Sequence, residues 1–389
     1  MSDVTTVVGF IPLLDCASLA VAVEKGFAAE EGLDLRLLRE TSWANIRDRV
    51  VVGHFDAAHM LAPMAIASTL GIGHLKMPMA APLSLGLGGN AITVSLRVWD
   101  LMVSEGVTSS AGPRALGEAL RNVVRTRERA NKQSFTFAMV YPFSAHNYEL
   151  RYWLAASGID PDRDVRLVVI PPPLLVDAMR EGQIDGFCVG EPWNSLAVSV
   201  GVGCIALPTT AVWPLSPEKV LGCRLEWSQR HPDRLQALVR ALYKAAHWCE
   251  RPENHLELAR LLAEPRFVGA PAEILLRGLS NRLYLQRGSD AEHLPEFYLP
   301  AAQAATFPWV NHALWFYSQM VRWGQVAFDP AHVAQVRATY RPDLYRLALG
   351  EITNIPSADT RIDALYDGVR FDSEDLPAYL KLLSQGCSG

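Results

Sequence analysis

The chain has 389 residues, 50% of them hydrophobic and 20% charged, which is ordinary for a globular protein and too long for one small core. A formal net charge of −5 argues against direct nucleic-acid binding, which normally needs a basic excess on one face. None of the six cysteines belongs to a C-x-x-C pair, so the sequence predicts free thiols and no zinc site.

The first part of the chain alternates between short apolar strands and helices. We predict strands at residues 5–12, 33–38, 55–58 and 91–95, and helices at residues 18–26, 45–52 and 63–70. Such alternation is typical of βαβ units, so it predicts a mostly parallel sheet in a first lobe of about residues 1–95.

The next part of the chain, about residues 96–224, repeats this alternation and predicts a second lobe. We predict helices at residues 112–129, 146–156 and 174–181, and strands at residues 135–140, 165–170, 185–189 and 204–207. From Arg234 onward the pattern is helical, and we expect about residues 225–389 to return to the first lobe with a helical cap. Two α/β lobes with a ligand cleft between them fit this order best.

Residues 53–60 and 184–193 share a pattern. In each, a short apolar strand carries an Asp next to small residues, and a Pro or a helical run follows. Strand ends of this kind present backbone donors and side chains to ligands in α/β folds. The repetition therefore predicts two similar lobes that each contribute to a ligand site.

The apolar run at residues 7–16 ends in a cysteine and could be mistaken for a lipoprotein export signal. Such a signal needs a basic n-region and small residues before the cleavage point, whereas Asp3 precedes the run and Asp15 adjoins Cys16. No apolar run approaches the roughly 18 residues of a membrane helix. If Met1 is the true start, we expect a cytoplasmic protein.

Catalytic motifs are missing from the sequence. The alternative architecture, a single larger doubly wound enzyme, has no Gly-rich phosphate loop, G-x-S-x-G elbow, H-E-x-x-H or EF-hand spacing to support it. No constellation of Cys or His suits a redox centre. We therefore expect a binding protein without cofactor or metal, and no enzyme.

Seven segments carry a resemblance to a known family, and they cover nearly the whole chain. They are GFIPL (9–13), EKGF (24–27), SWANIRD (42–48), DAAHMLAPM (56–64), RYWLAA (151–156), FCVGEPW (187–193) and PEK (217–219). In this order they resemble the nitrate- and bicarbonate-binding solute receptors of ABC transporters and, within that family, the cytoplasmic nitrate/nitrite sensors of the NasS type. The resemblance implies a two-lobed periplasmic-binding-protein-like (type II) α/β fold.

Nitrate is a planar, weakly hydrated monoanion, so its site needs an aromatic or apolar wall, several neutral N–H donors and about one positive charge. From their positions in the sequence alone, Trp43 would be a core residue and Lys219 a solvated residue of a loop. The resemblance instead implies that Trp43 is the wall and an N–H donor, and that Lys219 supplies the charge. Bicarbonate-binding relatives lack this lysine and use an acidic residue with calcium, so Lys219 favours nitrate or nitrite.

The resemblance also implies four further ligand-site residues. His146 begins a helix, where free N–H groups and the helix dipole favour an anion, although Phe143-Ser144-Ala145 replaces the Gly-Gly-Thr of the family. Asn90, with Gly89, matches a region where relatives place a glutamine amide. For Glu191 we expect a supporting role, holding Lys219 or a backbone donor.

Four other polar residues, Asp56, His59, Arg47 and Asp48, are expected to form caps and buried pairs.

Two functions stay open at this point. An exported receptor would deliver the anion to a transporter, whereas a cytoplasmic sensor would change its hold on a regulatory protein. The missing export signal favours the sensor. For that function the resemblance implies a NasT-type response-regulator antiterminator with an ANTAR RNA-binding domain, sequestered without ligand and released with it.

Overall fold

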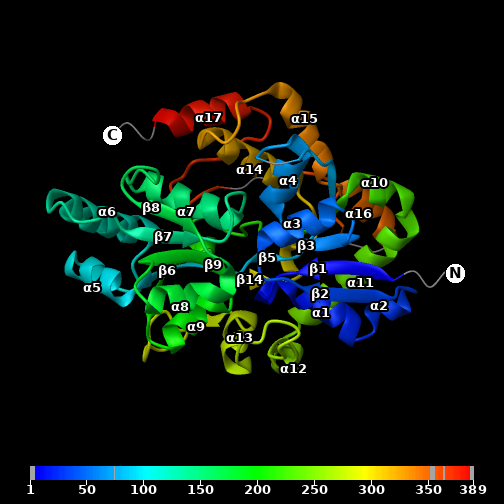
Figure 1. Cartoon of the computed structure of the whole chain (residues 1–389), viewed down its shortest axis with the longest axis horizontal. Coiled ribbons are helices and arrows are strands. Elements are labelled where there is room, and N and C mark those ends of the chain that lie inside the picture. The colour runs from blue at the N-terminus through cyan, green and yellow to red at the C-terminus, as the bar shows by residue number, and fades with distance from the viewer. Residues whose placement is uncertain (1–4, 74, 351–354, 362–363, 386–389) are drawn as a thin grey trace. The chain divides into compact units, whose positions relative to one another are not determined.

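The computed structural model describes residues 5–73, 75–350, 355–361 and 364–385. The chain forms two compact units, and each is assembled from three separate segments (Figure 1). Unit 1 comprises Met1–Leu87, Pro217–Ala272 and Tyr298–Arg361. Unit 2 comprises Gly88–Ser216, Glu273–Phe297 and Ile362–Gly389.

Unit 1 contains a five-stranded sheet in the order β2-β1-β3-β11-β4. Its strands are β1 (Thr6–Phe10), β2 (Leu35–Arg39), β3 (Ala57–Leu61), β4 (Met79–Ser84) and β11 (Lys219–Arg224). β1 runs parallel to β2 and β3, whereas β11 runs antiparallel to both β3 and β4. Every residue of β3 and β4 is buried, as expected for apolar strands covered on both faces.

The helices of unit 1 come from all three of its segments. They are α1 (Ala17–Glu24), α2 (Phe27–Glu30), α3 (Trp43–Val51), α4 (Ala62–Leu70), α10 (Leu225–Arg230), α11 (Pro232–Glu250), α12 (His255–Leu262), α14 (Val310–Arg322), α15 (Pro330–Thr339) and α16 (Pro342–Leu349). Short elements are the 3-10 turns Leu14–Cys16, Pro252–Asn254 and Ala302–Ala304 and the strand β14 (Tyr298–Leu299). α1 packs against α11, which also packs against α16, and α4 packs against α14 and α15 (Figure 1).

Unit 2 also contains a five-stranded sheet, in the order β10-β6-β9-β7-β8. Its strands are β6 (Asn90–Ser95), β7 (Thr136–Met139), β8 (Arg166–Val169), β9 (Gly186–Gly190) and β10 (Gly203–Pro208). β7 runs parallel to β8 and β9, whereas β6 is antiparallel to β9 and β10. Each unit thus combines three parallel strands with antiparallel neighbours.

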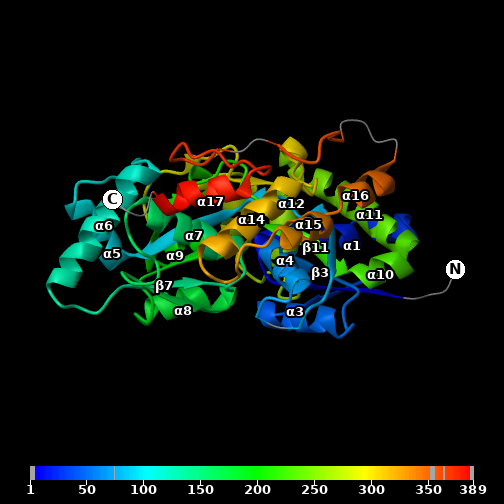
Figure 2. The ribbon, with the colours of Figure 1, turned by 90° about the horizontal axis from the view of Figure 1, so that it is seen from above.

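Helices cover both faces of the unit 2 sheet. They are α5 (Leu96–Ser104), α6 (Pro113–Arg129), α7 (Ala145–Ala156), α8 (Leu175–Arg180), α9 (Trp193–Ser199), α13 (Ala272–Leu279) and α17 (Leu376–Gln385). The remaining elements are the 3-10 turns Pro172–Leu174 and Thr209–Ala211 and the two-residue strands β5 (Leu87–Gly88), β12 (Arg282–Leu283) and β13 (Glu292–His293). α7 lies on one side of the sheet and α8 and α9 on the other (Figure 1), and α5 and α6 pack side by side (Figure 2).

The predicted alternation of strands and helices is present, but two expectations of the sequence differ from the structure. The sheets are mixed, because β11 and β6 each run against their neighbours. The segment boundaries also differ: β6, expected in the first lobe, belongs to unit 2, and β11, expected in the second, belongs to unit 1. Residues 273–297 also lie in unit 2 rather than in a return to the first lobe.

The two similar segments of the sequence do occupy equivalent positions, β3 and β9. Their aspartates lie at the amino ends of these strands, where Asp56 accepts a hydrogen bond from Val7 N–H (2.9 Å) and Asp185 one from Thr136 N–H (2.8 Å). An arginine pairs with each carboxylate. These aspartates therefore tie neighbouring strands together at the amino ends of β3 and β9.

The five cysteines in the described part of the chain are free and buried, while Cys387 lies outside the described residues. Burial raises the pKa of the thiols of Cys204 and Cys223 to about 12, so they stay protonated at neutral pH. None of the described helices has both the length and the apolar character that a membrane span requires.

Candidate functional site

Polar side chains of unit 1 gather at the carboxyl edge of its parallel strands. Asp15 lies in a 3-10 turn shortly after β1, Trp43 is the first residue of α3 after β2, and His59 lies within β3. Lys219 is the first residue of β11 and pairs with Leu61, the last residue of β3. Because β11 runs antiparallel, its amino end meets the carboxyl ends of the parallel strands.

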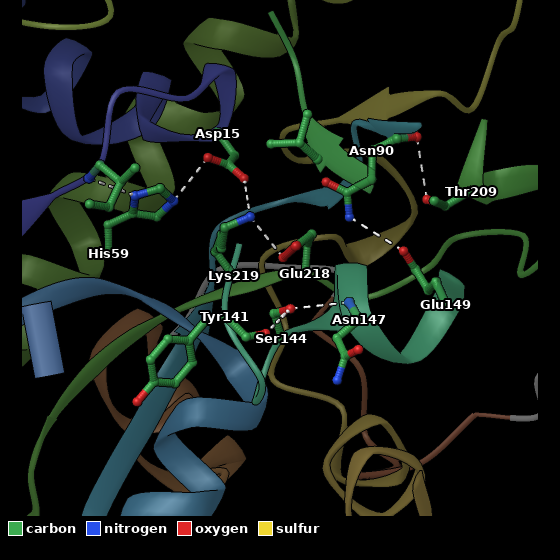
Figure 3. A network of polar contacts seen from close by, with 12 residues as sticks. Asp15, His59, Asn90, Tyr141, Ser144, Asn147, Glu149, Thr209, Glu218 and Lys219 are labelled. Atoms are coloured by element: carbon green, nitrogen blue, oxygen red, sulfur yellow. Dashed lines mark hydrogen bonds and ion pairs between the residues drawn. The ribbon is translucent and has the colours of Figure 1, made fainter. Parts of the chain in front are cut away.

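Lys219 is buried between two carboxylates. Its Nζ lies 2.8 Å from Asp15 Oδ2 and 2.7 Å from Glu218 Oε2, and all three residues are less than 10% exposed (Figure 3). Burial alone would lower the pKa of Lys219, but the two carboxylates outweigh it and raise this pKa above its usual value. Burial likewise would raise the pKa of Asp15, but Lys219 and His59 hold it well below its usual range.

His59 and Trp43 complete this cluster. His59 Nδ1 accepts a hydrogen bond from Ile11 N–H (3.4 Å), so the ring proton lies on Nε2, which faces Asp15 Oδ1 at 2.9 Å. The Trp43 ring lies 5.5 Å from the His59 ring and 5.5 Å from Lys219 Nζ. In the described part of the chain the buried Trp43 Nε1 has no hydrogen-bond acceptor. A buried ammonium and the indole ring of Trp43 are thus close together.

Unit 2 gathers a second polar set at the matching edge of its sheet. Asn90 begins β6 and pairs with Gly190, the last residue of β9, so Glu191 follows directly beside it. Gly89 C=O accepts a hydrogen bond from Glu191 N–H (2.9 Å). The Asn90 amide points toward Glu149 (Nδ2 to Oε2, 3.5 Å), and its backbone carbonyl accepts from Thr209 (3.4 Å, Figure 3).

The Glu191 carboxylate contacts the backbone of the helix that follows it, α9. Its Oε2 accepts a hydrogen bond from Ser195 N–H (3.3 Å), and the residue is 1% exposed. Burial raises the pKa of Glu191 to about 7, against the smaller opposing effect of its contacts with Ser195. Glu191 therefore holds a backbone donor of α9, whereas Lys219 is held by Asp15 and Glu218.

His146 lies in the first turn of α7. Ser144 caps this helix: its Oγ accepts from Asn147 N–H (3.1 Å) and donates to Tyr141 C=O (2.7 Å), as Figure 3 shows. The cap explains how Phe143-Ser144-Ala145 starts the helix without glycines. His146 and Glu149 are both buried and lie three residues apart, so they share one face of α7.

The structure brings the six predicted ligand residues into two sets: Trp43 and Lys219 in unit 1, and Gly89, Asn90, His146 and Glu191 in unit 2. Lys219 begins a buried strand, whereas its position in the sequence alone suggested a solvated loop, because its main chain pairs with β3. Its ammonium is paired with two carboxylates, which the sequence did not indicate.

The four residues that were expected to have structural roles differ in whether they form buried pairs. Asp56 ties β1 to β3, and His59 forms a buried pair with Asp15, as predicted. Arg47 and Asp48 instead form an ion pair with an exposed carboxylate (2.7 Å).

The sequence reasoning missed three acidic residues of these sets: Asp15, Glu149 and Glu218. The signal for Glu218 was its position next to Lys219, and for Asp15 its position in the loop after β1. Among the described residues no group of three or more His, Cys, Asp or Glu side chains could hold a metal ion.

Known proteins resemble the chain over most of its length. It is 33% identical over 388 residues to the nitrate/nitrite binding protein NrtA of Nostoc sp. strain PCC 7120, covering 96% of this chain and 84% of that protein. It is 36% identical to the nitrate import ATP-binding protein NrtC of Synechocystis sp. and 37% identical to the bicarbonate transport ATP-binding protein CmpC of Synechococcus elongatus. The chain covers 96% and 98% of its own length in these two matches but only 54% and 55% of the relatives.

Solved structures agree with this similarity. The crystal structure of the periplasmic nitrate-binding protein NrtA from Synechocystis PCC 6803 matches with a TM-score of 0.90 and 31% identity, over 97% of this chain and 98% of that chain. The alkanesulfonate-binding protein SsuA from Xanthomonas axonopodis pv. citri matches with a TM-score of 0.56 and 14% identity, over 82% of this chain and 93% of that chain, which is a likeness of fold alone.

A family model described as NMT1-like matches residues 2–263, more than half of the chain. The relatives named above that are more than 30% identical to the chain carry names of nitrate or bicarbonate binding or transport. The chain therefore belongs to the NMT1-like family and has an α/β fold of the periplasmic-binding-protein type.

Proposed function

We propose that the chain is a nitrate- or nitrite-binding protein of the solute-receptor type, without catalytic activity. The observation that carries this proposal is the match to the nitrate-binding protein NrtA over 97% of the chain. Bicarbonate transport proteins also resemble the chain, but the family resemblance links a lysine at position 219 to nitrate rather than to bicarbonate with calcium.

The chemistry of the predicted ligand residues supports the proposal. Trp43 offers an indole N–H that has no acceptor among the described residues, and Lys219 offers an ammonium that Asp15 and Glu218 keep charged in spite of its burial. Within unit 2 taken by itself, the start of α7 offers helix N–H groups, which favour an anion. Neutral donors with one ammonium suit a weakly hydrated monoanion.

Isothermal titration calorimetry on the purified chain tests the binding. We expect saturable binding of nitrate or nitrite and none of bicarbonate at equal concentration, with or without calcium. A bound ligand also stabilises the fold by about 2.7 kcal/mol at 100 times its Kd, so nitrate should raise the unfolding midpoint. Calcium-dependent bicarbonate binding without a nitrate response would refute the proposal.

Variants of Trp43 and Lys219 test the assignment of the ligand residues. Lys219→Ala should weaken nitrate binding tenfold or more, because a charge-assisted contact contributes roughly 1.5–3 kcal/mol. Trp43→Phe keeps an aromatic wall but removes the N–H, so it should weaken binding less than Trp43→Ala. Lys244→Ala, at an ion pair on the surface of unit 1, is the matched control. Unchanged affinity in the Lys219 and Trp43 variants would mean that the anion binds elsewhere.

A second candidate is the cytoplasmic sensor, which would sequester a NasT-type ANTAR antiterminator and release it on ligand binding. The observation that favours it concerns residues 7–16. They form much of β1 and the turn that carries Asp15, and Cys16 is fully buried. Lipid modification of Cys16 after cleavage would remove β1 from its place between β2 and β3.

Fractionation of the native host and co-purification separate the two candidates. The sensor predicts recovery from the cytoplasm with a small antiterminator that nitrate dissociates, since ligand and partner would favour different states of the protein. A receptor predicts an exported protein without such a partner. A complex that is indifferent to nitrate would exclude the sensor.

A further inference from the structure

Lys219 differs from an ordinary anion-binding lysine because two carboxylates already contact it. Asp15 approaches its Nζ to 2.8 Å and Glu218 to 2.7 Å. With both carboxylates ionised, the three side chains carry one positive and two negative charges. His59 adds a contact to Asp15 Oδ1 through its Nε2, while its Nδ1 accepts a hydrogen bond from Ile11 N–H.

Because these three side chains are buried, their charges act strongly on a neighbouring ligand. Asp15 and Glu218 are 7% and 3% exposed, and Lys219 is 1% exposed, so water and salt screen them weakly. An ammonium has three N–H groups, and carboxylate oxygens occupy two sides of this one (Figure 3). One N–H is left for a ligand oxygen, beside the Trp43 ring.

We infer that Asp15 and Glu218 are specificity-determining residues that restrict the anion beside Lys219 to a single negative charge. The inference rests on the proposed function, since it places the anion at Lys219. The repulsion between the surplus carboxylate charge and a ligand grows in proportion to the ligand's charge. A monoanion such as nitrate meets it once, whereas sulfate or hydrogen phosphate meets it twice.

Glu218→Gln tests the inference, because glutamine keeps the size of the side chain and removes its charge. The same change in potential acts on one charge of nitrate and on two of sulfate. If the variant tightens nitrate about tenfold, it should tighten sulfate about 100-fold. The sulfate-to-nitrate affinity ratio, measured by calorimetry, should therefore rise about tenfold.

Two comparison variants separate charge from shape. Glu218→Asp retains the charge, so its affinity ratio should stay within threefold of the wild type. Glu226→Gln removes an exposed carboxylate of α10, paired with Arg230, and should leave both affinities unchanged. If Glu218→Gln does not fold, Asp15→Asn removes the other carboxylate and should shift the ratio in the same direction.

The outcomes distinguish this inference from the function on which it rests. If the wild type binds nitrate and Glu218→Gln weakens nitrate and sulfate equally, Glu218 only positions Lys219, and the inference is overturned while the function stands. An unchanged ratio with nitrate binding intact has the same meaning. Absence of nitrate binding by the wild type would overturn both.

Discussion

A buried ammonium between two carboxylates makes Lys219 important for the stability of the fold, apart from its proposed role in binding. Taking charges out of water costs several kcal/mol per ion, and only mutual attraction in good geometry offsets that cost. The short contacts of Lys219 with Asp15 and Glu218 meet this condition. Loss of the lysine leaves two carboxylates buried without their cation.

Lys219→Ala should therefore lower the free energy of unfolding by about 3–5 kcal/mol at neutral pH, the range found when one partner of a buried pair is removed. Urea denaturation followed by circular dichroism measures the change. The control Lys244→Ala breaks a more exposed pair and should cost at most about 1 kcal/mol. Equal effects of the two variants would contradict the electrostatic account.

Glu191 should make stability depend on pH. Its pKa rises from 4.5 to about 7 in the folded chain, so between these values the folded state holds a proton that the unfolded state has released. Stability from this group is complete below pH 4.5 and is lost as pH rises through 7, by about 3 kcal/mol in all. Glutamine at this position does not titrate.

Urea denaturation of the wild type and Glu191→Gln at pH 5, 6, 7 and 8 tests this dependence. The difference in unfolding free energy should shift in favour of Glu191→Gln as pH rises. Glu118→Gln, at an exposed glutamate of α6, should follow the wild type at every pH. Parallel curves for the wild type and Glu191→Gln would show that the pKa of Glu191 is not raised.

At the scale of elements, local patterns predicted most strands and helices but not their pairing. The strand at residues 91–95 was found correctly, yet it was assigned to the wrong lobe because its partners, β9 and β10, lie far away in the sequence. β11 was missed, since its first residues follow a Pro-rich loop and its strand conformation depends on pairing with β3 and β4.

In the candidate site, too, local patterns predicted positions along the chain but not contacts between distant residues. Trp43, His146 and Asn90 could be placed at element starts, because a cap or a glycine precedes each of them. The ion pairs of Lys219 could not be predicted, since they require the register of β11 on β3 and the turn after β1. Charge balance in a site depends on such non-local contacts.

Ser144 fixes the first turn of α7, which carries the predicted ligand residue His146. Its hydroxyl satisfies Asn147 N–H and Tyr141 C=O, and the residue is fully buried. Ser144→Ala should cost about 1 kcal/mol of stability and also weaken nitrate binding, because the first turn of α7 carries His146. Ser95→Ala, at the cap of α5, is a matched control that should cost similar stability without affecting affinity. Equal affinities of the two variants would separate α7 from the site.

At the scale of the whole molecule, the two units differ in how their sheets are assembled. The sheet of unit 2 comes from one segment of the chain, whereas the sheet of unit 1 needs strands from two segments. All five strands of the unit 2 sheet lie within residues 88–216. The unit 1 sheet instead takes β11 from residues 219–224 and inserts it between β3 and β4, which come from the first segment. Residues 1–87 alone therefore lack the strand that joins β3 to β4.

This difference predicts how fragments behave. Residues 88–216 expressed alone should retain a cooperative urea transition, because their sheet is complete and α5 to α9 cover it. Residues 1–87 should show none, since the edges of β3 and β4 would be left with unpaired N–H and C=O groups. Adding a fragment of residues 217–361 should restore a transition to residues 1–87 by supplying β11 and α11. A cooperative transition in residues 1–87 alone would show that the first segment folds without β11. The lack of a cooperative transition in residues 88–216 would show that the sheet of unit 2 depends on the later segments.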